Sequence, residues 1–268
     1  MKPKQLNRYQ ALIADIFLSL YQKGSTAIPF TRVELIAKAE KLNIDLPKNP
    51  GDILYSFRYR NPLPEPILKT QPKGMEWVIE GAGRAKYEFR LVPINRISPN
   101  PNLITIKIPD ATPEIISANS LSDEQALLAR VRYNRLIDIF LGITAYSLQN
   151  HLRTTVKGLG QIEIDEVYVG VDRFGCQYIV PVQAKGGSDQ LSTVQAKQDI
   201  ACCAEKFPNL ACRAISAQFM EDSKIAIFEL CLDEFGLVKT VEERHYQLVP
   251  ADRIDNSELE TYRSRAGS

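Results

Sequence analysis

Residues 160–171 read GQIEIDEVYVGV, and residues 177–185 read QYIVPVQAK. Apolar and polar side chains alternate along the first stretch, which is typical of a strand. The DRFG sequence at 172–175 is a turn, so the second stretch is predicted to return as a strand and pair with the first. This hairpin is the centre of the predicted C-terminal fold.

The segments around the hairpin are expected to complete a larger domain. Apolar spacing predicts helix across 121–150, which Gly142 divides into two helices. A helix is also predicted at 190–206, followed by strands at 211–220 and 224–232. The order helix, strand, strand, helix, strand, strand predicts an α/β or α+β domain with a mixed sheet.

Polar side chains on the hairpin indicate a candidate metal-binding site. Glu163 and Asp165 share one face of the first strand, and Gln183 and Lys185 share one face of the second. Pairing is expected to bring Asp165 close to Gln183 and Lys185. Oxygen ligands suit Mg²⁺, which activates water and stabilises charge on a phosphate, and a lysine beside it can orient the nucleophile. We therefore predict a metal-binding active site here; the alternative is a polar strand end.

The N-terminal part predicts a different module. Residues 81–84, Gly-Ala-Gly-Arg, form a basic turn between two predicted strands. Three helices come before this hairpin, and the order is that of a winged helix-turn-helix, in which the third helix enters the major groove of DNA. The predicted helices are 6–22, 33–42 and 53–60, and the strands are 75–80 and 86–93.

Side chains on the predicted third helix and the hairpin tip are candidates for DNA contact. Arginine and asparagine can make bidentate contacts to base edges. The alternative is that Tyr55, Phe57 and Tyr59 are partly core and that the arginines are solvated. The candidates are Tyr55, Ser56, Arg58, Arg60 and Asn61 on the helix, with Arg84 at the tip.

Charge divides the chain in the same way. Residues 1–100 hold 16 Lys and Arg against 9 Asp and Glu, whereas residues 101–268 hold 17 against 23. The net charges of +7 and −6 indicate a basic half that contacts nucleic acid, although chance clustering on solvated faces gives the same pattern. We predict a winged-helix-like domain at 1–95, a linker with a short strand at 96–120, and a catalytic domain at 121–268.

The hairpin sequence resembles the core of the PD-(D/E)xK nucleases. Asp165 matches the first acid of that motif, and Gln183-Ala184-Lys185 matches its acid-x-lysine triplet. Glu163 corresponds to an extra acid of the resolvase-like branch. Gln195 or Gln198 resembles the helix glutamine that often completes the site. The resemblance covers roughly residues 122–232 and, with the basic module in front, is closest to Type II restriction endonucleases.

The resemblance implies a Mg²⁺-dependent, sequence-specific endonuclease acting on double-stranded DNA. It implies catalytic Asp165, Gln183, Lys185, Glu163 and Gln195, with metal held by Asp165, Gln183 and Glu163. It further implies a homodimer and a separate cognate methyltransferase. Gln183 departs from the motif, because an amide oxygen coordinates a cation without contributing charge; Glu163, or else Asp189, is expected to compensate.

Two other functions fit the same sequence. A non-catalytic DNA-binding regulator on a degenerate nuclease fold is favoured by the neutral Gln183. A structure-specific resolvase or repair nuclease shares the same core. Glu124 is either an additional acid of the site or a helix-surface charge.

Composition places the protein in the cytoplasm. Its five cysteines show no CxxC spacing and are expected to be reduced thiols, and no stretch approaches eighteen apolar residues. No phosphate-binding loop of the form GxxxxGK[ST] is present, which argues against ATP-driven translocation within the chain.

Overall fold

A computed structural model describes residues 6–59, 61–94, 97–119, 124–186, 191–234 and 236–266 of the 268-residue chain. The chain divides into two compact units. The first comprises Met1–Asn95 with Thr154–Ile162, and the second comprises Arg96–Arg153 with Glu163–Ser268.

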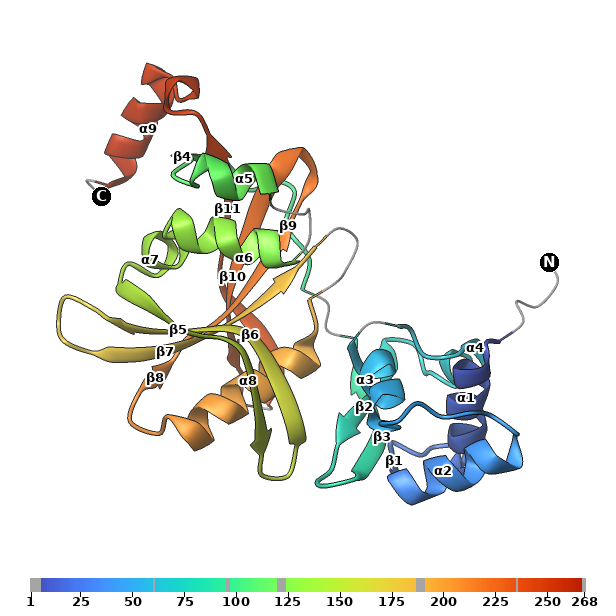
Figure 1. The fold of residues 1–268 in the computed structure, drawn as a ribbon. Helices are drawn as coiled ribbons and strands as arrows, with labels where there is room; N and C mark the ends of the chain where they lie inside the picture. Colours follow the sequence, from blue (N-terminus) through green and yellow to red (C-terminus); the bar gives the residue numbers. More distant parts are fainter. Residues whose placement is uncertain are drawn as a thin grey trace. The chain divides into compact units, whose positions relative to one another are not determined.

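The first unit combines helices with a small antiparallel sheet (Figure 1). The sheet has the order β1-β3-β2. The β2–β3 hairpin therefore pairs, through β3, with β1, the strand that comes directly before α2. The elements are α1 (Arg8–Leu20), β1 (Ala27–Thr31), α2 (Arg32–Lys41), α3 (Gly51–Tyr59), α4 (Glu65–Leu68), β2 (Met75–Gly81) and β3 (Lys86–Pro93).

Local sequence explains the second helix of this unit. Thr31 Oγ1 accepts a hydrogen bond from the backbone N–H of Glu34 at 3.3 Å, and Glu34 Oε2 accepts one from the backbone N–H of Thr31 at 2.7 Å. This reciprocal capping box satisfies donors that the first helical turn leaves free. Aromatic rings fill the core beneath it, with the centroids of Phe30 and Phe89 4.8 Å apart. The unit therefore has its own apolar core.

The second unit is built on an eight-stranded mixed sheet. Seven of its strands follow the order β4-β11-β10-β9-β7-β6-β5, and the eighth, β8, pairs with β7. The β6–β7 and β9–β10 pairs are antiparallel, whereas β9 runs parallel to β7. The strands are β4 (Thr105–Pro109), β5 (Thr144–Val156), β6 (Gly160–Val171), β7 (Gln177–Lys185), β8 (Ala211–Cys212), β9 (Ala214–Phe219), β10 (Lys224–Leu232) and β11 (Val238–Val249).

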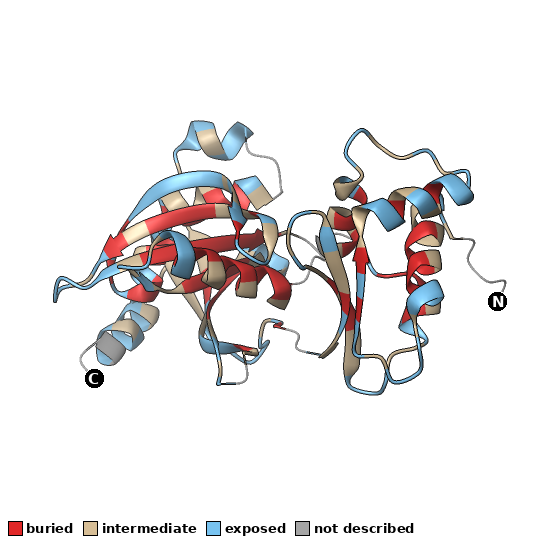
Figure 2. Ribbon diagram, turned by 90° about the horizontal axis from the view of Figure 1, so that it is seen from below, coloured by how far each residue is buried: buried red, intermediate tan, exposed pale blue. Residues whose placement is uncertain are grey.

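Helices cover both faces of this sheet (Figure 1). On one face α6 (Glu124–Tyr133) and α7 (Leu136–Leu141) pack on apolar residues that include Val182 and Ala184. On the other face α8 (Thr193–Lys206) packs over β7, β9 and β10. Figure 2 shows the buried residues running along the central strands between these layers. The unit is completed by α5 (Glu114–Asn119) and α9 (Asn256–Ala266).

The predicted hairpin is confirmed as β6 and β7, and the helix and two strands predicted after it are confirmed as α8, β9 and β10. The prediction of helix up to residue 150 is wrong. Gly142 adopts a left-handed conformation (φ 65°) and ends α7, and the chain then continues as β5. A glycine in this conformation is a usual helix stop, so Gly142 separates a helix from a strand and not two helices.

Other strands were missed or placed in a connecting segment. The short strand predicted within the linker 96–120 is confirmed as β4, but it pairs in parallel with β11 at the edge of the large sheet and so belongs to the second unit. Its short apolar run is stabilised by a partner strand about 140 residues later in the chain. In the first unit, β1 was missed because Pro29 interrupts a five-residue strand; proline is tolerated there because β1 is an edge strand.

Candidate active site

The carboxylate of Asp165 is bound to the strand that carries Gln183 and Lys185. Regular pairing of β6 with β7 extends as far as Glu166 opposite Val182. At the next step, Asp165 Oδ2 accepts a hydrogen bond from the backbone N–H of Ala184 at 2.9 Å. Ala184 lies between Gln183 and Lys185, so this bond places the Asp165 carboxylate beside both residues.

The amide of Gln183 is held on one side only. Its Nε2 donates to Asp199 Oδ2 at 2.9 Å and to the backbone oxygen of Glu163 at 3.2 Å. The side chain is 3% exposed, and its Oε1 atom is buried with no hydrogen-bond partner among the described residues. A buried polar atom without a partner costs free energy, so this oxygen is the natural point at which a ligand would bind.

Lys185 is buried at the end of β7 and reaches an acid on α6. Lys185 is 8% exposed as a whole residue, and its Nζ lies 3.3 Å from Oε1 of Glu124. The Glu124 side chain is much more open, at 40% exposed. The lysine therefore holds a charge within the site while its partner remains accessible to water.

Asp199 was missed at the level of sequence. It lies on α8, four residues after Gln195, and residues at this spacing share one face of a helix. Asp199 is 3% exposed, and burial raises the pKa of its carboxyl group well above the ordinary value, with a further increase from the charge of Asp165. The sequence feature that indicates Asp199 is a charged residue on a helix face that is otherwise expected to be apolar.

The ionisable groups carry an excess of acids. Burial, followed by the charge of Glu124, raises the pKa of Asp165, and the Ala184 hydrogen bond with the charge of Lys185 opposes this increase. Three carboxyl groups, on Glu124, Asp165 and Asp199, surround the single ammonium of Lys185. Buried like charges disfavour full ionisation, so the cluster is stabilised by taking up protons or a cation.

Glu163 has partners of its own. Its carboxylate lies 3.2 Å from Nε of Arg153 and 3.3 Å from Nδ1 of His151, both on β5. Its backbone oxygen contributes to the site by accepting from Gln183. The predicted charge compensation by this side chain therefore competes with an existing ion pair.

The glutamines of α8 lie on its buried side. Gln195 is in the first turn, is 8% exposed, and has a buried Oε1 without a hydrogen-bond partner within the described part of the chain. Gln198 is also buried, at 4% exposed. Asp189, the other predicted compensating acid, lies outside the described residues.

The donors available for a metal are few and are all oxygens. In the described ranges, no group of three or more His, Cys, Asp or Glu residues is arranged to hold a metal ion. Asp165 and the free Oε1 of Gln183 nevertheless offer two oxygen donors beside excess negative charge. Mg²⁺ commonly binds through one or two carboxylates and keeps several waters, so these residues fit Mg²⁺ better than a metal that requires a full protein cage.

The candidate DNA-contacting residues of the first unit differ in accessibility. Ser56 Oγ accepts a hydrogen bond from Asn61 Nδ2 at 2.5 Å, which ties the last turns of α3 to a residue two positions beyond its end. Tyr55, Ser56 and Arg58 are half-buried. Asn61 and Arg84 are exposed. Arg60 lies outside the described residues.

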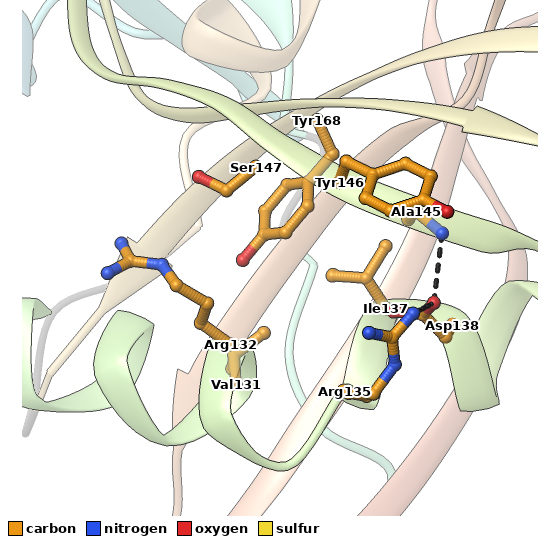
Figure 3. A pocket seen from close by; sticks show the side chains of 9 residues that line it. All are labelled: Val131, Arg132, Arg135, Ile137, Asp138, Ala145, Tyr146, Ser147 and Tyr168. Carbon is orange, nitrogen blue, oxygen red and sulfur yellow. Dashed lines mark hydrogen bonds and ion pairs between the residues drawn. The ribbon is translucent and has the colours of Figure 1, made fainter.

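A separate pocket of about 230 Å³ opens on the α6–α7 side of the large sheet. Figure 3 shows Arg132 and Ser147 on one side of the Tyr168 ring, and Arg135 and Asp138 on the other. Arg135 is paired with Asp138, which also lines the pocket, and Arg132 is paired with the buried Glu166 beside it, so both arginines already have an acidic partner.

Comparison of the sequence with known protein families found no match, and comparison with curated proteins found none either. Within the described residues, no helix has the length and apolar character needed to cross a membrane. The function is therefore inferred from the chemistry of the cluster around Asp165.

Proposed function

We propose that the protein is a Mg²⁺-dependent endonuclease that hydrolyses phosphodiester bonds in duplex DNA, similar to Type II restriction enzymes. The observation that carries the proposal is the hydrogen bond from the Ala184 N–H to the Asp165 carboxylate. It gathers an acid from the middle of β6 with an amide oxygen and a lysine from the end of β7, which is the set of groups that metal-assisted phosphate chemistry requires.

Each residue has a distinct role in this proposal. Asp165 and Gln183 Oε1 would hold Mg²⁺, which when bound supplies an acidified water and neutralises charge on the phosphate. Lys185 presents an ammonium from a site with little solvent, where its attraction to a phosphate oxygen is strong. Glu163 and Gln195 would support the site. Glu163 accepts from Gln183 through its backbone oxygen, and Gln195 offers a buried Oε1 that has no hydrogen-bond partner among the described residues.

The first unit would bind the DNA. Its helices followed by a hairpin fit a winged helix-turn-helix, and its sequence carries the positive charge that attracts phosphates. Arg84 and Asn61 are the accessible candidates for contact, and Tyr55, Ser56 and Arg58 lie on α3. We propose that two copies act together, since cutting both strands at a short site commonly uses two active sites, and that a separate methyltransferase protects the host DNA.

One observation favours a second function. Gln183 brings no negative charge, and the described residues contain no cluster of three metal-ligating side chains of the His, Cys, Asp or Glu type. A DNA-binding regulator on a degenerate nuclease fold would retain the fold without cutting. A structure-specific nuclease would cut branched DNA only.

The test is cleavage of plasmid DNA with Mg²⁺ by the wild type and by Asp165→Asn and Lys185→Met. We expect discrete fragments from the wild type and a rate loss of about 100-fold or more in each variant, as for removal of one group that stabilises transition-state charge. The exposed residues Asp252 and Lys239 supply matched controls, Asp252→Asn and Lys239→Met.

Three outcomes distinguish the candidate functions. Intact DNA with every duplex, four-way junction and divalent metal tested excludes the endonuclease and favours the regulator. Cleavage confined to four-way junctions identifies a resolvase. Equal cutting by the wild type and both site variants would show that the active site lies elsewhere.

A further inference from the structure

We infer that Asp199 is a positioning residue that fixes the side-chain amide of Gln183 so that its oxygen, and not its nitrogen, faces the cation. The inference rests on the proposed function and identifies a residue that completes the same site. It is drawn from two hydrogen bonds and from one buried atom that has no partner.

The two hydrogen-bond partners of Gln183 determine the orientation of its amide. The backbone oxygen of Glu163 can only accept a hydrogen bond, and the carboxylate of Asp199 provides a second acceptor. Rotating the amide by half a turn would place its oxygen against both acceptors and lose two hydrogen bonds. Nε2 is therefore directed at Glu163 and Asp199, and Oε1 is directed away from them.

The oxygen left free is the one the site needs. Oε1 of Gln183 is buried and lacks a partner within the described ranges, while the Asp165 carboxylate is bound to the next residue, Ala184. An amide oxygen and a carboxylate at adjacent positions form a pair of hard donors. Asp199 thus acts on the cation through Gln183, as an outer residue that orients a ligand.

The same contacts explain why glutamine occupies position 183. A glutamate there would place a third acceptor against the Glu163 backbone oxygen and the Asp199 carboxylate, both of which now receive a donor. The amide supplies donors to one side and an oxygen to the other. Gln183 and Asp199 therefore work as one unit, and replacing only one of them breaks it.

The experiment measures Mn²⁺ binding by full-length protein without DNA, using electron paramagnetic resonance, with thermal unfolding as a check on folding. Asp199→Leu removes the acceptor, and we expect Mn²⁺ affinity to fall by about 10-fold or more, as for loss of an outer residue that orients a ligand. Asp199→Asn retains an oxygen acceptor, and we expect it to bind within about threefold of the wild type. In a Gln183→Leu background, Asp199→Leu should cause no additional loss.

The outcomes separate this inference from the proposed function. Failure of the wild type to bind Mn²⁺ overturns both. If the wild type binds and cuts DNA while Asp199→Leu keeps full affinity, the inference is overturned and the nuclease proposal stands. If Asp199→Asn loses as much affinity as Asp199→Leu, the charge of Asp199 matters directly and it is a ligand, which also overturns the positioning role.

Discussion

Lys185 and Glu124 meet at 3.3 Å across the end of β7, but water reaches them very unequally, because the lysine side chain is 10% exposed and the glutamate side chain 40%. Exposed ion pairs contribute about 0–1 kcal/mol. Glu124→Gln is therefore expected to slow DNA cleavage by less than about fivefold, whereas Lys185→Met removes the charge itself. Single-turnover cleavage rates compare the two. A loss for Glu124→Gln as large as that for Lys185→Met would make Glu124 part of the catalytic set.

Stability should depend on the arginine that neutralises Glu166. The Glu166 side chain is fully buried and accepts from Arg132 Nε at 2.8 Å and from Ser147 Oγ at 2.6 Å. Arg132→Met leaves a buried carboxylate without its cation, and we expect the free energy of unfolding to fall by about 3 kcal/mol. Urea denaturation measures the change.

A second substitution provides the control for this prediction. Removing both charges in Arg132→Met/Glu166→Leu should recover most of the lost stability, because no buried charge is then left unpaired. A double variant as unstable as the single one would show that packing, and not charge, is responsible for the loss.

The buried acids predict an unusual dependence on pH. Burial raises the pKa of Asp199 and of Asp165, so in the folded protein these groups bind protons more tightly than in the unfolded chain. Where the folded state holds more protons, stability decreases as pH rises. The decrease should begin near the ordinary pKa of Asp, about 4, and continue through the raised pKa of Asp199.

Urea denaturation of metal-free protein across this range tests the pH dependence. Asp199→Asn should flatten the decrease and be more stable than the wild type at neutral pH, because an amide carries no charge to bury. Added Mg²⁺ should stabilise the wild type more as the pH rises, because the cation competes with protons for the acids. An identical slope in both proteins would contradict the assignment of the pH effect to Asp199.

Binding of DNA should depend on Arg84 at the tip of the β2–β3 turn. Arg84 is exposed, so Arg84→Ala removes a charge without disturbing a core. We expect weaker binding to all duplex sequences and a salt dependence reduced by about one unit of slope, as for loss of one phosphate contact. Fluorescence anisotropy at several salt concentrations measures both, with Lys239→Ala as the control on the second unit.

The hairpin could be predicted because its pattern is local. Alternation along residues 160–171 and the DRFG turn specify β6 and β7, and these strands bring Asp165 to Gln183 and Lys185 by geometry alone. The extent of β5 could not be predicted in this way. Apolar residues after Gly142 continue a helical spacing, and only pairing in the large sheet makes this segment a strand.

The electrostatic partners could not be predicted either. Asp199 is close to Gln183 only because α8 packs on β7, a contact that neither segment specifies by itself. Glu163 shares a face with Asp165, as alternation requires, but Arg153 and His151 of β5 contact its carboxylate. The sequence therefore indicates which groups are available, and packing determines which of them meet.

Asp165 and Glu166 are neighbours in the chain that serve opposite faces of one sheet. The Asp165 carboxylate lies in the candidate active site and accepts a hydrogen bond from the Ala184 N–H, whereas Glu166 is paired with Arg132 on the α6 side. Inserting or deleting one residue in β6 would exchange the two sides, because strand side chains alternate. During evolution this strand can accept substitutions far more readily than changes in length, so its residue count should be kept even where relatives differ widely in identity.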